Sequence, residues 1–504
     1  MPKSGGRGRF DRALQSIRGT RFLLPSRSPA ASEIARDTSG YLARLVADQI
    51  FSRVSGANKV GGNALRILRD AAENYPAWLA AIAAATHHIH FENYIIRDDT
   101  VGREFADALS AKARSGIPVR VLYDWMGCLT TNPFLWRRLR QAGVEVRCFN
   151  RPRLDSPFDW LSRNHRKTLT VDHDIAYVSG LCIADVWRGD PARSISPWRD
   201  TGIELRGPAV ADVEAAFAQS WAFAGGVLPQ HNVTPAPAPQ GDIALRVIGS
   251  RPNTMGVYRA DQLIAALARH TLWLTDAYFV GTTAYTRTLC DAAQDGVDVR
   301  LLVPGASDLP IAKALSRAGY RPLLEAGIRV FEWTGPMLHA KTAVADGRWA
   351  RIGSSNLNLA SWMGNWELDV AIENVPFARQ MESMFEDDLT HAVEIVLGSR
   401  RVHAAPDSKR RHGRPRRGSP GRLAVSAVGL GSTVTAAITN RRALDPAEAT
   451  VMLAAGALLL ALAALALAVP HLVTIPLAIV ATWIAITLLI RAARLRQAPP
   501  AVER

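Results

Sequence analysis

The segment "NHRKTLTVD", residues 164–172, returns 174 positions later as "LHAKTAVAD", residues 338–346. Each copy holds a histidine, a lysine two residues further on and an aspartate at the end of a short apolar run. Runs rich in threonine, leucine and valine are typical of β-strands. One such pattern arises easily by chance, whereas two copies in one chain indicate a duplicated fold.

Other segments repeat in the same order. Three pairs are similar: "HIHFENYII" (88–96) and "LWLTDAYFV" (272–280), "GIPVRVLYD" (116–124) and "GVDVRLLVP" (296–304), "QAGVEVRCF" (141–149) and "EAGIRVFEW" (325–333). Between these strand-like runs lie helical patterns such as "GREFADALSAKARSG" (102–116), which ends at a glycine suited to a helix C-terminus. Alternating strands and helices predict an α/β fold of two tandem domains, with mostly parallel or mixed sheets flanked by helices.

Composition divides the 504 residues further. The Pro-rich stretch "LPQHNVTPAPAPQGD" (228–242) marks the boundary between the copies. We predict a basic N-terminal segment (1–57), a first repeat (58–230), a second repeat (240–399), a basic linker (400–445) and a membrane hairpin (450–491).

The net charge of +15 is concentrated in the tails. Residues 1–27 carry +6 and residues 400–422 carry +8, while residues 28–399 carry about −2. A nearly neutral body argues against nucleic acid as a partner, because a nucleic-acid groove is strongly basic. The basic tails are either solvated flanks or contacts with anionic lipid.

Two uncharged runs of 19 residues, Val451–Val469 and Leu472–Ile490, each have the length of a membrane-spanning helix. Arg441 and Arg442 precede the pair and further arginines follow it, so the positive-inside rule places both ends and the globular body on the cytoplasmic side. The N-terminus has no apolar core of signal-peptide length, and export is therefore not expected.

The spacing within the motifs predicts which of their residues share one face of a strand. Positions i and i+2 of a strand project from one face, so His165 and Lys167 point together, as do His339 and Lys341. The aspartates Asp172 and Asp346 fall on the opposite face of a continuous strand. We assign both a structural role as hydrogen-bond or ion-pair acceptors near the strand end.

These paired motifs, followed in the second copy by Gly353, Ser354, Asn356 and Glu367, closely resemble the phospholipase D superfamily. The arrangement of residues 58–399 is most similar to its bacterial cardiolipin synthase branch. The resemblance covers about two thirds of the chain, and the doubled motif is more specific for the superfamily than for a substrate. It implies one active site shared by both domains. Its motif residues here are His165, Lys167, Asp172, His339, Lys341 and Asp346.

A phosphodiester needs cations and donors on its non-bridging oxygens, and Lys167, Lys341, Asn356 and Ser354 are the candidates. One neutral and one protonated imidazole permit a covalent phosphohistidine route without a metal or another cofactor. The resemblance makes His165 the nucleophile and the other histidine the acid, although the residues themselves do not choose between them.

Acidic partners can fix the orientation of each imidazole. Glu367 and Asp200 occupy the positions of the family's supporting acids, although Asp200 is equally compatible with a surface position beside Arg199.

Two features depart from the pattern or compete with it. Cys182 stands where the second copy has Asn356, and we expect it to be a small core residue. His87, His88 and His90 suggest a metal cluster, but no acidic or cysteine partner lies at ligand spacing, so we interpret them as a helix end and a strand start.

The resemblance predicts a phosphatidyltransferase that makes cardiolipin from phosphatidylglycerol at the bacterial inner membrane, with its catalytic domain on the cytoplasmic side. Its expected partners are anionic phospholipids (phosphatidylglycerol and cardiolipin) and the membrane; the oligomeric state is not indicated. Three alternatives stay open: a phospholipase D hydrolase, a nuclease of the same superfamily, and a catalytically weakened phospholipid-binding protein.

Overall fold

The computed structural model describes residues 48–152, 162–228, 237–397 and 402–404, together with scattered positions between 457 and 489. The chain divides into two compact units, Met1–Phe51 and Ser52–Arg504. The few described residues of the first unit are helical. Everything that follows concerns the second unit.

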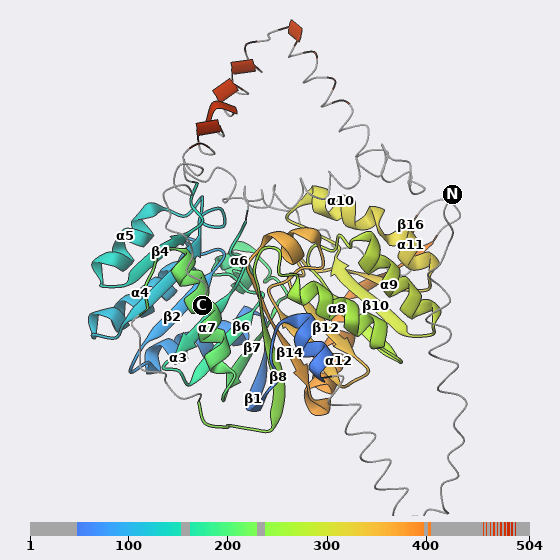
Figure 1. The fold of residues 1–504 in the computed structure, drawn as a ribbon, viewed down its shortest axis with the longest axis horizontal. Helices are drawn as coiled ribbons and strands as arrows, with labels where there is room; N and C mark the ends of the chain where they lie inside the picture. Colours follow the sequence, from blue (N-terminus) through green and yellow to red (C-terminus); the bar gives the residue numbers. More distant parts are fainter. Residues whose placement is uncertain are drawn as a thin grey trace, which may run out of the picture. The chain divides into compact units, whose positions relative to one another are not determined.

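Within the described ranges the strands form one sixteen-stranded sheet built from two repeats (Figure 1). The first repeat comprises β1 (Val60–Arg69), α3 (Asp70–Ala84), β2 (Ile89–Asn93), α4 (Thr100–Arg114), β3 (Val119–Asp124), α5 (Pro133–Gln141), β4 (Glu145–Phe149), β5 (Thr168–Val171), β6 (Ile175–Ser179), α6 (Asp185–Arg188), the 3₁₀ turn η2 (Pro191–Arg193), β7 (Thr201–Arg206) and α7 (Val210–Phe223). The second comprises β8 (Ile243–Ser250), α8 (Gly256–Leu267), β9 (Thr271–Thr275), α9 (Thr283–Gln294), β10 (Asp298–Pro304), α10 (Pro310–Ala318), α11 (Tyr320–Glu325), β11 (Arg329–Trp333), β12 (Thr342–Ala345), β13 (Trp349–Gly353), the π-helical turn η3 (Ala360–Gly364), β14 (Glu367–Glu373), α12 (Val375–Leu389), β15 (Ala392–Leu397) and β16 (Val402–Ala404).

The strand order shows the duplication. Strands β1 and β8 are antiparallel neighbours at the centre of the sheet. Outward from β1 the order is β7-β6-β5-β2-β3-β4, and outward from β8 it is β14-β13-β12-β9-β10-β11. The two series match element by element, which confirms the duplicated α/β fold. Because the repeats share one sheet, their motif strands lie on either side of a common centre.

The sheet is mixed, and the alternative of a mostly parallel sheet is wrong. Among the strands of the described ranges, only β2-β3-β4 and β9-β10-β11 run parallel. The motif strand β5 pairs antiparallel with both β2 and β6, and β12 does the same with β9 and β13. A turn of a few residues joins each motif strand to the next one, and such a short connection can only make an antiparallel hairpin.

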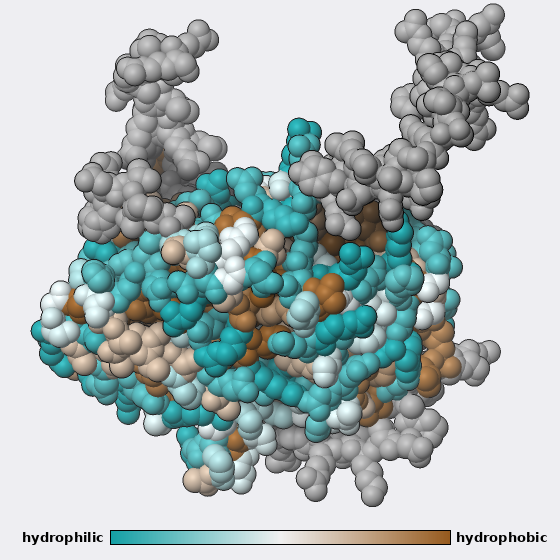
Figure 2. All heavy atoms as spheres, turned by 90° about the horizontal axis from the view of Figure 1, so that it is seen from below, coloured by the Kyte–Doolittle hydropathy of each residue, from teal (hydrophilic) through white to brown (hydrophobic). Residues whose placement is uncertain are grey.

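Successive side chains along a strand point to opposite faces of the sheet, so each repeat has an apolar layer on both faces. In β3, Val121 packs into the core under α3 and α4, whereas Leu122 faces Phe217 and Trp221 of α7. The helix expected at residues 102–116 is α4; Asp99 caps it by accepting a hydrogen bond from Gly102 N. On the face seen in Figure 2, hydrophilic residues predominate and hydrophobic ones form only small patches.

No helix among the described residues has the length and apolarity to cross a membrane. The hairpin expected at 450–491 falls mostly outside the described residues. The same is true of the basic linker (400–445) and of most of the N-terminal segment (1–57).

Candidate active site

The motif histidines lie just before their strands. We expected one strand over residues 164–172, but β5 begins at Thr168 and β12 begins at Thr342. The preceding residues leave the sheet to pair with the other repeat. His165 N donates to Trp366 O at 2.8 Å, and His339 N donates to Arg199 O at 2.7 Å. Each motif is therefore fixed by the opposite half of the protein.

The carboxylates beside the imidazoles also come from the opposite repeat. His165 Nδ1 lies 3.0 Å from Glu367 Oε2, and His339 Nδ1 lies 2.7 Å from Asp200 Oδ2. Both carboxylates are fully buried. Asp200 is thus not a surface residue, and neither histidine keeps its acidic partner if one repeat is removed.

Further side chains hold these two carboxylates. Ser354 Oγ donates to Glu367 Oε2 at 2.5 Å, and Asn365 Nδ2 donates to Glu367 Oε1 at 3.2 Å. Trp187 Nε1 donates to Asp200 Oδ2 at 2.9 Å. Neither Asn365 nor Trp187 could be assigned this role from the sequence, because the contact that each makes with a carboxylate appears only in the folded structure.

Two buried ammonium groups accompany the imidazoles. Lys341 Nζ lies 2.9 Å from His339 Nδ1 and also contacts the carbonyl oxygen of the same histidine. Lys167 Nζ donates to His165 O and lies 5.3 Å from the centre of the Tyr94 ring. Burial lowers the pKa of both lysines.

The electrostatics join the two motifs into one site. The pKa of His165 is lowered to about 4, mainly by burial; the charge of Glu367 opposes this shift, and the charges of Lys167 and of Lys341 in the other repeat contribute to it. Burial likewise lowers the pKa of His339 to about 3, with contributions from Lys341 and from Lys167 across the repeat boundary. The structure therefore brings both imidazoles and both ammonium groups into one neighbourhood, where the imidazoles are neutral at neutral pH.

The two predicted phosphate donors of the second repeat differ in their contacts. Ser354 directs its hydroxyl to Glu367, so it supports that carboxylate. Asn356 is only 5% exposed, and its Oδ1 has no hydrogen-bond partner among the described residues. That oxygen can accept a hydrogen bond from a ligand hydroxyl, and the Nδ2 group of the same amide is the one that can donate to a phosphate oxygen.

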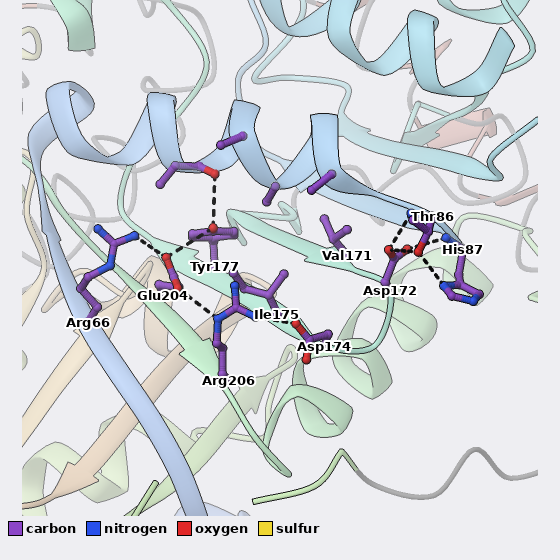
Figure 3. A pocket seen from close by; sticks show the side chains of 14 residues that line it. Arg66, Thr86, His87, Val171, Asp172, Asp174, Ile175, Tyr177, Glu204 and Arg206 are labelled. Carbon is purple, nitrogen blue, oxygen red and sulfur yellow. Dashed lines mark hydrogen bonds and ion pairs between the residues drawn. The ribbon is translucent and has the colours of Figure 1, made fainter. Parts of the chain in front are cut away.

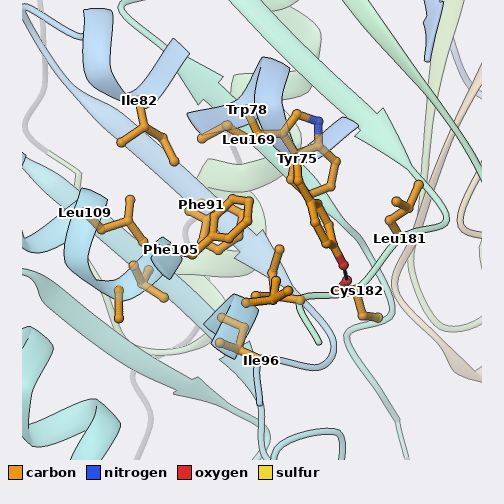
Figure 4. Close-up of a cluster of buried hydrophobic side chains, with 14 of the residues drawn as sticks. Tyr75, Trp78, Ile82, Phe91, Ile96, Phe105, Leu109, Leu169, Leu181 and Cys182 are labelled. Carbon is orange, nitrogen blue, oxygen red and sulfur yellow. Dashed lines mark hydrogen bonds between the residues drawn. The ribbon is translucent and has the colours of Figure 1, made fainter. Parts of the chain in front are cut away.

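Cys182 lies in the apolar core of the first repeat (Figure 4). Its carbonyl accepts a hydrogen bond from Tyr75 Oη at 2.6 Å, and burial raises the pKa of its thiol. The expectation of a small core residue is confirmed.

The motif aspartates do not join the histidines, because they follow β5 and β12 at the far end. Asp172 accepts hydrogen bonds from Thr86 N and His87 N at 2.6–2.7 Å (Figure 3), and from His88 N at 2.8 Å. Asp346 accepts equivalent bonds from the backbone of residues 269–271. Both aspartates connect a strand end to the preceding chain and contact no group of the imidazole cluster in these hydrogen bonds.

A groove of about 640 Å³ opens at this same end, between α3 and strands β5, β6 and β7 (Figure 3). Its rim carries Arg66, Glu204 and Arg206, which are paired with one another or with Asp174. Neither His165 nor His339 lines it, so the groove is separate from the candidate active site.

Comparisons with known proteins agree with this geometry. A family model described as "Cardiolipin synthase, PLD-like domain" matches residues 78–184 and 263–389, one segment in each repeat. Cardiolipin synthase of Alkalihalophilus pseudofirmus is 32% identical over 397 residues, which is 76% of each chain. Cardiolipin synthase A of Pseudomonas aeruginosa is 32% identical over 414 residues, covering 79% of this chain and 82% of that protein. The crystal structure of phosphatidylserine synthase from Haemophilus influenzae has the same fold, with a TM-score of 0.55 at 16% identity over 68% of this chain and 90% of that one.

Proposed function

Because the chain belongs to the cardiolipin synthase family of phospholipase D-like proteins, we propose that it is a phosphatidyltransferase. It moves a phosphatidyl group from phosphatidylglycerol to a second phosphatidyl alcohol. The observation that carries this proposal is the crossed pair of imidazole–carboxylate contacts, with two buried ammonium groups beside them.

The first half-reaction forms a phosphohistidine. Nε2 of His165 attacks phosphorus, the P–N bond forms, and the P–O bond to glycerol breaks. His339 donates a proton from Nε2 to the leaving oxygen, so glycerol departs neutral. Lys167, Lys341 and Asn356 bind the non-bridging oxygens, whose charge grows as phosphorus becomes five-coordinate.

Hydrogen bonding supports His165 as the nucleophile. Its Nδ1 faces two acceptors, Glu367 Oε2 at 3.0 Å and the carbonyl of Ser354 at 3.1 Å. Nδ1 must therefore carry the proton, which leaves the lone pair of Nε2 for attack. Nδ1 of His339 instead meets one acceptor, Asp200, and one donor, Lys341, so its tautomer is less strictly fixed.

Substrate binding raises the pKa of His339, so that its ring can take from solvent the proton that it later donates. The pKa of this histidine is lowered to about 3, mainly by burial, so the ring is neutral at neutral pH. A phosphodiester anion at roughly 4 Å contributes about 4 kcal/mol at an effective dielectric constant of about 20, which equals about 3 pKa units. Binding of the phosphodiester anion therefore favours the protonated form of His339, which is the form that acts as general acid.

The second half-reaction reverses the roles. His339, now neutral, takes the proton from the hydroxyl of the second lipid, whose oxygen attacks phosphorus as the P–N bond breaks. One phosphodiester replaces another, so the exchange needs no nucleotide. Water in place of the lipid alcohol makes the same site a hydrolase that releases phosphatidic acid.

A membrane anchor fits a lipid substrate. We place residues 450–491 in the bilayer as a helical hairpin, on the strength of their two uncharged 19-residue runs. The arginines on both sides of the hairpin put the catalytic domain at the cytoplasmic surface of the bacterial inner membrane. There the basic linker (400–445) contacts anionic lipid headgroups.

The test uses purified full-length chain in phosphatidylglycerol vesicles, with mass spectrometry of the products. We expect cardiolipin and glycerol in equal amounts from the wild type and neither from His165→Asn, while His391→Asn, at an exposed position of the second repeat, matches the wild type. Phosphatidic acid as the main product establishes the hydrolase instead. Identical lipid profiles for wild type and His165→Asn refute catalysis at this site.

A further inference from the structure

Three histidines surround one glutamate at the far end of the first repeat. Glu214, on α7, has its Oε1 2.9 Å from His88 Nε2 and its Oε2 2.5 Å from His173 Nδ1. The ring of His90 lies 4.6 Å from that of His88. One ligand atom from each of His88, His90 and Glu214 lies within 4.8 Å of the other two.

The backbone holds two of these histidines in fixed positions. The motif aspartate Asp172 accepts a hydrogen bond from His88 N at 2.8 Å, and its own N–H donates to His88 O at 3.0 Å. His173 is the next residue in the same turn. A single clamp therefore positions both imidazoles against α7 before any ligand binds.

The second repeat provides an internal comparison. Asp346 N donates to Thr271 O, so Thr271 corresponds to His88. Trp273 stacks on Phe385 as His90 stacks on Phe217, which makes Trp273 the counterpart of His90. The glutamate is present in both repeats: Glu382 lies three residues before Phe385, just as Glu214 lies three residues before Phe217. Repeat 1 thus has imidazoles where repeat 2 has a hydroxyl and an indole.

The positive partner of the glutamate also differs. Arg379, on the same helix, donates to Glu382 at 2.8 Å. The corresponding residue of the first repeat, three positions before Glu214, is Ala211. The side chain of Glu214 is only 16% exposed and its charge is met by imidazoles. A cation bound by Glu214 and these imidazoles supplies the positive charge that Arg379 supplies to Glu382 in the second repeat.

His173 occupies a position that favours glycine. Its φ is +59°, and the corresponding residue in repeat 2 is Gly347 with φ +58°. Two successive left-handed residues are typical of an aspartate–glycine turn, and a β-carbon at the second one is strained. Backbone strain held at one residue points to a use for its side chain.

We propose that His88, His90 and Glu214, with His173 beside them, bind one divalent transition-metal ion of the zinc class. Imidazole nitrogen with one carboxylate oxygen is a ligand set for such ions rather than for magnesium or calcium. Tetrahedral ligands about 2.0–2.1 Å from zinc lie about 3.3 Å apart, so the ligand atoms need only small shifts. Arg120 Nη1 is 3.5 Å from Nε2 of His90 and pairs with Glu145, so His90 binds through Nδ1.

The proposed ion has a structural role and takes no part in catalysis. It ties the start of β2 and the β5–β6 turn to α7, whereas His165 precedes β5 at the other end of that strand. Seven residues lie between His165 and His173, and they include the whole of β5. The proposal is therefore independent of the transferase activity.

The test uses untagged full-length chain in detergent, stripped of metal with a chelator and titrated with Zn²⁺ by calorimetry, with thermal unfolding in parallel. We expect one saturable Zn²⁺ per chain and a higher unfolding midpoint with the ion. Two variants take the residues of repeat 2, His173→Gly and His88→Thr, and each weakens Zn²⁺ binding about tenfold or more.

His173→Gly separates ligation from folding. Glycine relieves the strained turn, so the metal-free variant unfolds at the wild-type temperature or above, yet its midpoint responds less to Zn²⁺. His391→Ala, which removes an exposed histidine of the second repeat, leaves binding unchanged. Absence of saturable binding to the wild type, or equal affinity in the wild type and both variants, overturns the proposal.

Discussion

Replacing Asp200 by asparagine tests the crossed arrangement most directly. The substitution keeps the shape of the side chain and an oxygen that can accept from Thr201 N, which now bonds Oδ1 at 2.9 Å. It removes the negative charge 2.7 Å from His339 Nδ1. The matching substitution in the other half is Glu367→Gln, which removes the charge beside His165.

The expected loss follows from the contact that disappears. A hydrogen bond to a charged group is worth about 1.5–3 kcal/mol, which corresponds to about 10-fold to about 200-fold in rate. The contact strengthens as His339 gains its proton, so the loss falls on the step in which that proton is used. An asparagine that stabilises the wrong tautomer extends the loss to about 10⁴-fold, as in serine protease triads.

The leaving group tells the two carboxylates apart. A nitrophenyl phosphodiester of the same lipid releases nitrophenolate, which needs no proton. In single-turnover release we expect Asp200→Asn to fall within about threefold of the wild type on this substrate, because the acid His339 is bypassed. Glu367→Gln keeps its full deficit on both substrates, because it acts on the nucleophile His165.

Asp174→Asn is the matched control. It loses only an ion pair with Arg206, and its side chain is 55% exposed. We expect its rate to equal the wild-type rate on both substrates. The opposite pattern for Asp200→Asn and Glu367→Gln assigns the histidines the reverse roles. Wild-type rates for both variants with phosphatidylglycerol refute the reasoning that the crossed carboxylates assist the chemistry.

Three further predictions concern stability and binding. Burial lowers the pKa of His165 to about 4 and that of His339 to about 3, whereas both are about 6.5 in the unfolded chain. Between these values the unfolded chain binds protons that the folded chain does not, so the free energy of unfolding falls as the pH drops from about 6.5 toward about 3. Thermal unfolding of a variant with both histidines replaced by asparagine is expected to depend less on pH over this range. Asn356→Ala lowers kcat/KM about 10²-fold with little change in melting temperature, because its buried Oδ1 makes no hydrogen bond among the described residues; a lower melting temperature at unchanged kcat/KM contradicts a phosphate contact. Asp172→Ala costs about 2 kcal/mol of unfolding free energy in denaturant melts, through three lost backbone contacts, while the folded variant keeps its transferase rate; a large rate loss at full stability shows that the aspartate acts in catalysis.

The fold was predictable because its signals are local. Apolar runs of strand length, helical patterns and turn glycines each lie within a few residues, and their repetition gave the duplicated architecture. Strand direction was harder to derive, because β5 takes its antiparallel sense from a hairpin turn at Asp172 rather than from its own composition. The exit of His165 from the strand depends on Trp366, which lies 201 positions away in the sequence.

The candidate site was predictable as a set of residues but not as a set of pairs. Sequence positions placed one supporting acid after each motif, whereas the structure pairs each acid with the histidine of the other repeat. Those contacts span 202 residues for His165 and 139 residues for His339. The histidines at 87–90 illustrate the same limit, because the carboxylate that approaches His88 is 126 residues away.

Duplication explains how a second site can arise without disturbing the first. Among the described residues, the carboxylate of Asp172 accepts from backbone N–H groups and one hydroxyl of residues 86–88, and the carboxylate of Asp346 accepts from backbone N–H groups of residues 269–271. The side chain at the position of His88 can therefore be threonine in one repeat and imidazole in the other, because neither aspartate carboxylate bonds it; in the second repeat Thr271 Oγ1 adds a single hydrogen bond from Asp346 N at 3.0 Å. The imidazoles of the catalytic motif have no such freedom, because their orientation rests on side-chain carboxylates across the repeat boundary. Divergence between the repeats should therefore concentrate at the aspartate end of the motif strands, which is where the histidines around Glu214 are found.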